Sequence, residues 1–159
     1  MLRSGQVATE YIDKYLFEAD PELLGRVARQ MATLIPAETQ ALAGLELGGV
    51  PLATVLSQLT GLPGTFVRKN AKPYGTRKLA EGHDPTGQRV TLVEDVITTG
   101  GAVVAAAAAL RVLGATVSDV VCAIDRSAPG ETALAKAGIT VLPVLTKADL
   151  DAAAAARSS

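Results

Sequence analysis

The sequence is poor in the residue types that build disulfides, zinc sites and base-stacking surfaces. Its 159 residues include one cysteine, one histidine, no tryptophan and only 3% aromatic residues. A single cysteine excludes a disulfide within the chain, and so few sulfur and imidazole ligands predict no structural zinc. The shortage of aromatic side chains and the net charge of −1 argue against a surface for single-stranded nucleic acid, because such surfaces combine stacking with a basic field.

Long apolar runs are also missing, although apolar residues are plentiful. We find no signal peptide and no run long enough to span a membrane, so we expect a cytoplasmic location. A hydrophobic fraction of 48% with 19% charged residues predicts a single globular domain over residues 1–159. Cys122 lies in an apolar run, which favours a buried strand residue over a nucleophile. His83 lies in a Gly/Asp/Pro turn, which favours exposure.

Helical and strand patterns alternate along the chain. The spacing of apolar residues predicts helices over 21–35, 50–60, 101–113, 131–137 and 148–157, and strands over 41–47, 65–67, 90–95, 117–124 and 139–145. Residues 69–78 have no periodicity and are predicted as a loop, and 82–87 as a turn. Because the strands are apolar without alternation, we expect an α/β fold with a central, mainly parallel sheet flanked by helices.

The segment Val90–Ala102 carries the strongest chemical signal. Its apolar strand ends in Glu94 and Asp95, and a Thr-Thr-Gly-Gly turn then leads into an alanine-rich helix. Backbone N–H groups of a glycine-rich turn at a helix N-terminus, together with threonine hydroxyls, suit an anion and above all a phosphate. The alternative is a plain strand–turn–helix connection that binds nothing, although two adjacent acids are less expected there.

A basic loop is the second signal. Arg68, Lys69, Lys72, Arg77 and Lys78 fall within eleven residues and directly follow a predicted strand. Such a cluster suits a clamp for a polyanion near the same sheet edge. The alternative is a solvated loop with ordinary surface charge.

The sequence Val-Glu-Asp-Val-Ile-Thr-Thr-Gly-Gly, which begins at Val93 in the first segment, resembles the phosphoribosyl pyrophosphate (PRPP) motif of type I phosphoribosyltransferases. The resemblance implies that fold, with Glu94 and Asp95 on the ribose hydroxyls and Thr98–Ala102 around the 5′-phosphate. It also implies Mg²⁺ held mainly through PRPP, with no directly ligating residue certain. The implied PRPP contacts in this segment are Glu94, Asp95, Val96, Ile97, Thr98, Thr99, Gly100, Gly101 and Ala102.

The basic loop resembles the catalytic loop of orotate phosphoribosyltransferases. In that family the loop closes over the active site of the neighbouring subunit of a dimer and neutralises pyrophosphate. The resemblance therefore implies a homodimer in which Arg68–Lys78 is a flexible loop that reaches the partner's site. Tyr74 stands where many members carry His, and Asn70 replaces the usual Glu. The implied catalytic residues are Arg68, Lys69, Lys72 and Asp95, and the loop's implied PRPP contacts are Arg68, Lys69, Lys72 and Tyr74.

Three further segments are similar to the same family. Leu2–Gly5 and Tyr11–Asp13 resemble its N-terminal hood, which implies a PRPP contact for Arg3. A frayed terminus is the alternative. The family's extra helical segment ahead of this motif is missing here, so we expect a partial hood over residues 1–20.

Gly44–Ala53 resembles the pyrophosphate loop, with Gly48 where some members carry Lys; a plain strand-to-helix turn is the alternative. The orotate contacts implied by the resemblance are Tyr11, Ile12, Thr98 and Arg126, the last of which could instead form a surface pair with Asp125.

Together these resemblances imply an enzyme of pyrimidine biosynthesis that joins orotate to PRPP and releases pyrophosphate. Two alternatives stay open: a phosphoribosyltransferase for another base, or a non-catalytic PRPP-sensing regulator. No basic helix for DNA is visible, and the lysines of the loop favour an enzyme.

Overall fold

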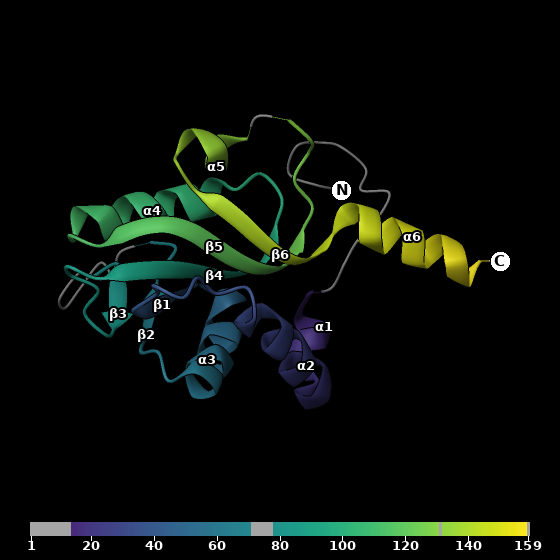
Figure 1. Cartoon of the computed structure of the whole chain (residues 1–159), viewed down its shortest axis with the longest axis horizontal. Helices are drawn as coiled ribbons and strands as arrows, with labels where there is room; N and C mark the ends of the chain where they lie inside the picture. The colour runs from purple at the N-terminus through teal and green to yellow at the C-terminus, as the bar shows by residue number, and fades with distance from the viewer. Residues whose placement is uncertain (1–13, 71–77, 131, 159) are drawn as a thin grey trace.

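The computed structural model describes residues 14–70, 78–130 and 132–158, in which one six-stranded sheet lies between two layers of helices (Figure 1). The strand order across the sheet is β3–β2–β1–β4–β5–β6. Every neighbouring pair is parallel except β2 and β3, which are antiparallel. The strands are β1 (Ala41–Leu45), β2 (Gly64–Val67), β3 (Ala80–Gly82), β4 (Arg89–Ile97), β5 (Thr116–Asp125) and β6 (Thr140–Thr146).

Helices cover both faces of the sheet, as Figure 1 shows. One face packs against α4 (Gly101–Val112) and α5 (Ala133–Lys136), with Leu92, Leu110 and Leu134 in the apolar layer. The other face packs against α1 (Lys14–Ala19), α2 (Pro21–Ala32) and α3 (Gly49–Thr60) around a layer that includes Met31, Leu52 and Val121. Burial on both faces explains why the strands lack alternation, and the predicted fold class is confirmed.

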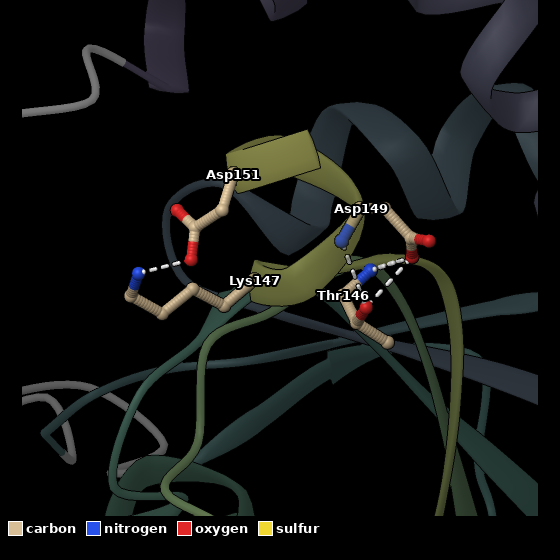
Figure 2. Close-up of polar contacts among 4 residues, drawn as sticks. All are labelled: Thr146, Lys147, Asp149 and Asp151. Atoms are coloured by element: carbon tan, nitrogen blue, oxygen red, sulfur yellow. Dashed lines mark hydrogen bonds and ion pairs between the residues drawn. The ribbon is translucent and has the colours of Figure 1, made fainter. Parts of the chain in front are cut away.

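The last helix, α6 (Lys147–Arg157), begins with a capping box and runs outward from the end of β6 (Figure 1). The Thr146 hydroxyl lies 3.3 Å from the backbone nitrogen of Asp149, and the Asp149 carboxylate accepts the Thr146 N–H at 2.7 Å (Figure 2). Lys147 and Asp151 add an ion pair at 2.6 Å one turn apart. These local contacts define the start of a helix that buries none of its residues.

The observed elements differ from the predicted ones mainly at short or terminal segments. The helix predicted over 21–35 ends at Ala32, because Pro36 disfavours helical geometry in the residue before it. α1 and the edge strand β3 were not predicted, since three to six residues are too few to establish a period. β4 runs to Ile97, two residues further than predicted. His83 is half-buried rather than exposed, with Nε2 at 2.7 Å from Gln88 Oε1.

The strand order changes direction between β1 and β4. The chain leaves β1 through α3 toward β2, and it leaves β4 through α4 on the opposite face toward β5. The two connections therefore diverge at the carboxyl ends of adjacent strands, where open α/β sheets bind ligands. In the described part of the chain, no helix is both long and apolar enough to cross a membrane.

Candidate active site

A pocket of about 520 Å³ opens at this carboxyl edge. Residues that follow β1 and β2 form one wall, and the end of β4 with the first turns of α4 forms the other. It is lined by Leu45, Glu46, Val67, Arg68, Lys69, Asn70, Leu79, Glu94, Val96, Ala102, Ala105 and Ala106. Arg68 and Lys69, which form the stem of the basic loop, therefore meet the acidic end of β4 in one hollow. A second hollow of about 600 Å³ lies between the end of α4 and β3, away from this edge.

The two adjacent acids of β4 point to opposite faces of the sheet. Glu94 lines the pocket and is 9% exposed, whereas Asp95 is fully buried on the α3 side. The Asp95 carboxylate accepts the N–H of Val96 at 2.6 Å, and the Asp95 N–H donates to Glu94 Oε1 at 3.0 Å. Glu94 is therefore ready to contact a ligand, while Asp95 would reach one only if the turn above it shifts.

That turn is the β1–α3 connection, and it packs directly on Asp95. A Cβ at Gly48 would overlap Asp95 Oδ2, and one at Gly49 would overlap the carbonyl oxygen of Val93. A Cβ at Gly44 would come within 2.7 Å of the Ala53 Cβ. The glycines of this segment are thus required by the close approach of the turn to the strand and to α3. The Glu46–Leu47 peptide bond in the turn is cis.

The Thr-Thr-Gly-Gly turn lies directly before α4, where the sequence predicts an anion site. Gly100 has φ of +79° and precedes the helix, and a Cβ there would lie 2.6 Å from Leu134. No side chain caps the helix at this residue, and no acidic residue stands in its first turn. Thr98 and Thr99 are exposed beside these first N–H groups, and Thr99 Oγ1 accepts the Gly101 N–H at 3.4 Å. The positive end of α4 is thus available to a phosphate.

Arg126 directly follows β5, beside the end of β4. Its N–H donates to the carbonyl oxygen of Ile97 at 2.8 Å, which joins the carboxyl ends of β4 and β5. The side chain of Ile97 is 2% exposed and lies in the core, so a contact of this residue with PRPP would have to use its backbone. The neighbouring Asp125 carboxylate accepts the N–H of Ser127 at 2.9 Å.

The stem of the basic loop is fixed to the sheet on both sides. Arg68 donates its N–H to the Leu79 carbonyl oxygen at 2.7 Å, and its Nε lies 3.5 Å from Glu81 Oε1 of β3. The N–H of Lys69 donates to Glu46 Oε2 at 2.8 Å. Sequence reasoning missed Glu46, because the strand was predicted to run from 41 to 47 and this acid lay inside it, whereas β1 ends at Leu45.

The remaining predicted site residues cannot be assigned to the pocket. Arg3, Tyr11, Ile12, Lys72 and Tyr74 lie outside the described residues. The hood is described only from α1 onward.

The predicted thiol environment is confirmed. Cys122 pairs with Glu94 across β4 and β5 and is fully buried, and burial raises the pKa of its thiol to about 12. Such a thiol stays protonated and is a poor nucleophile. Within residues 14–70, 78–130 and 132–158, no group of three or more His, Cys, Asp or Glu side chains could hold a metal ion.

Comparisons with known proteins match the chain and its fold to one family. A model of the phosphoribosyl transferase domain matches residues 18–143. An orotate phosphoribosyltransferase of Nocardioides sp. is 68% identical over 152 residues, covering 96% of this chain and 85% of that protein. The crystal structure of orotate phosphoribosyltransferase from Aeropyrum pernix has a TM-score of 0.82 at 31% identity, covering 96% of this chain and 88% of the other.

A crystal structure of Mycobacterium tuberculosis orotate phosphoribosyltransferase in complex with PRPP has a TM-score of 0.73 at 31% identity, covering 88% of this chain and 82% of that one. These matches extend over nearly the whole chain and include its pocket. The chain therefore belongs to the phosphoribosyl transferase family, and within it to the orotate phosphoribosyltransferases.

Proposed function

We propose that this chain transfers the 5-phosphoribosyl group from PRPP to orotate, giving orotidine 5′-monophosphate and pyrophosphate in pyrimidine biosynthesis. The observation that carries the proposal is the single pocket in which Arg68, Lys69 and Glu94 meet beside the uncapped start of α4. This arrangement offers cations for a pyrophosphate, a carboxylate for ribose hydroxyls and helix N–H groups for a 5′-phosphate. A cytoplasmic location fits such an enzyme.

In the proposed reaction, N1 of orotate bonds to C1 of the ribose, the bond from C1 to pyrophosphate breaks with its electron pair leaving on the pyrophosphate, and the N1 proton passes to the pyrophosphate or to water. Positive charge develops on the ribose ring, and negative charge develops on the leaving pyrophosphate. Glu94 stabilises the ribose side, joined by Asp95 when the turn above it shifts, and Arg68, Lys69 and Lys72 stabilise the pyrophosphate. Catalysis is therefore mainly positioning and charge stabilisation, without a covalent nucleophile.

In this proposal orotate is bound by Arg126, which is not among the residues that line the pocket and directly follows β5. A guanidinium group suits the carboxylate of a planar ring, and the Arg126 backbone is joined to β4 at Ile97. Thr98, together with Tyr11 and Ile12 of the hood, completes the proposed contacts to the base. Arg3 and Tyr74 are proposed to contact PRPP.

Mg²⁺ fits this site as a partner of the substrate. Because the described residues offer Glu94 but no cluster of acids, the ion would be held mainly by PRPP oxygens, as is usual for Mg²⁺ with phosphate substrates. When bound, it would neutralise part of the pyrophosphate charge.

The proposed active unit is a homodimer in which Arg68–Lys78 reaches the neighbouring site. Arg68 and Lys69 form the stem and line the pocket of their own chain, and the part of the loop that follows them is proposed to reach the partner.

Loss of orotate absorbance in the presence of PRPP and Mg²⁺ tests the function. We expect turnover by the wild type and a decrease of at least about a hundredfold in Lys69→Ala, because a cation on the leaving group is lost. Lys147→Ala, which removes an exposed lysine of α6, is the matched control and should keep wild-type turnover. Absence of turnover in the wild type would refute the proposed function, and normal turnover in Lys69→Ala would refute the role of the loop.

A further inference from the structure

Glu46 connects two segments that the proposed function brings to the pyrophosphate. It is the first residue after β1, and it begins the turn that packs on Asp95. Its N–H donates to the Val67 carbonyl oxygen at 2.9 Å, and its carboxylate accepts the Lys69 N–H at 2.8 Å. Glu46 therefore forms hydrogen bonds with Val67 and Lys69, the two residues that flank Arg68.

Arg68 is also held from the opposite side. Its N–H donates to Leu79, and its guanidinium lies near Glu81 of β3. These contacts hold Arg68 on the β3 side. On the β1 side, the hydrogen bond from the Lys69 N–H to the Glu46 carboxylate holds the backbone at Lys69. Losing it would leave Arg68 held while Lys69 could move away from the pocket wall.

We propose that Glu46 is a positioning residue, which holds the backbone of Lys69 so that this lysine meets the pyrophosphate of PRPP. The inference rests on the proposed function. A carboxylate accepts a stronger hydrogen bond from a backbone N–H than a neutral acceptor does, which suits an exposed position where water competes. A small displacement of a charged group from its productive position lowers the rate steeply.

The alternative role for an acid in this pocket is electrostatic repulsion of PRPP, which predicts the opposite effect of removing its charge. A negative charge near the pyrophosphate site could act by repelling PRPP, in which case removing the charge would strengthen binding. The positioning role depends mainly on the reach of the acceptor, and its charge adds only part of the strength of the hydrogen bond, so three substitutions separate the two roles.

The test uses steady-state kinetics with PRPP varied, on the full chain. Glu46→Gln keeps the reach and loses the charge, so kcat/KM for PRPP should stay within about threefold of wild type. Glu46→Asp keeps the charge and shortens the reach, and Glu46→Ala loses both, so each should lower kcat/KM about five- to tenfold, with KM for orotate unchanged. Glu38→Ala, at an exposed turn before β1, is the control and should match wild type.

Amide hydrogen exchange at Lys69 in the ligand-free protein gives a readout independent of activity. The Lys69 N–H should exchange faster in Glu46→Asp and Glu46→Ala than in wild type and Glu46→Gln, while the core amide of Val93 stays unchanged. Three outcomes would each overturn the role of Glu46. They are equal kinetic effects of the Gln and Asp variants, tighter PRPP binding by Glu46→Gln, and wild-type kinetics in Glu46→Ala. No turnover by the wild type would overturn the proposed function, and the positioning role with it.

Discussion

Gly48 shows how strictly one residue is constrained in this site. A Cβ at this position would overlap the buried carboxylate of Asp95, so either the turn or the acid must move in Gly48→Ala. We expect a loss of about 1–3 kcal/mol in the free energy of unfolding, from overpacking. We also expect a decrease of about tenfold or more in kcat/KM for PRPP, because the acid and the turn are both displaced. Urea unfolding and steady-state kinetics measure the two effects.

Gly25→Ala is the matched control for Gly48→Ala. Gly25 lies inside α2, and its added Cβ would come only to ordinary contact distance, 3.4 Å, from the end of the flexible Arg29 side chain. Alanine in a helix interior should stabilise the fold by about 0.5–1 kcal/mol relative to glycine and leave kinetics unchanged. If Gly48→Ala behaved in the same way, the close packing of the turn on Asp95 would have no functional importance.

Single residues also show where sequence reasoning reached its limit. The pattern of an apolar strand followed by two acids correctly predicted that Glu94 and Asp95 lie at the carboxyl edge. Alternation of side chains along a strand sends them to opposite faces, so only Glu94 lines the pocket. Glu46 was missed because its importance comes from Lys69, which is distant in sequence and adjacent only across β1 and β2.

At the level of elements, the start of α6 has a pH-dependent cap. Hydrogen bonds from the hydroxyl and then the N–H of Thr146 hold the pKa of the Asp149 carboxyl below its usual range. Because the folded pKa is lowered, the cap is fully present above the unfolded value of about 3.9 and is lost as pH falls through the lower folded value. We expect the first turn of α6 to fray on acidification in that window, as amide chemical shifts by NMR would report.

Two variants isolate the cap from other effects of acid. Asp149→Ala should show the frayed first turn already at neutral pH, with little further change on acidification. Asp151→Ala removes the ion pair with Lys147 and keeps the capping box, so the acid-induced change should persist. An unchanged α6 in Asp149→Ala would contradict the assignment of the cap.

The elements that the sequence predicted correctly are those with a long or strongly marked pattern. Runs of apolar residues located β1, β4, β5 and β6, and Gly114 with φ of +92° ends α4 at the predicted place. β3 could not be found in this way, because its three residues form a strand only through pairing with β2. Tertiary context, and not local preference, determines such an edge strand.

For the whole molecule, the proposed dimer predicts complementation between two impaired variants. Lys72→Ala damages the part of the loop beyond the stem, and Glu94→Gln damages the pocket. If each loop serves the neighbouring site, a mixed dimer contains one site with a native loop and a native pocket. Random one-to-one mixing should then recover about a quarter of wild-type activity, because half of the dimers are mixed and one of their two sites is intact.

Subunit exchange before the assay is required, and mixing without exchange is the control. If exchanged mixtures stayed as inactive as the separate variants while mass measurement showed mixed dimers, each loop would serve its own site. Recovery of activity by monomers would equally exclude the proposed arrangement.

The identity of the accepted base is the most direct test of the proposed function. The wild-type protein should be incubated with PRPP, Mg²⁺ and either orotate, uracil or adenine, and nucleotide and pyrophosphate should both be quantified. We predict orotidine 5′-monophosphate and pyrophosphate in equal amounts with orotate, and no nucleotide with the other two bases. A nucleotide formed from another base but not from orotate would contradict the assignment, and PRPP binding without any product would identify a sensor in place of an enzyme.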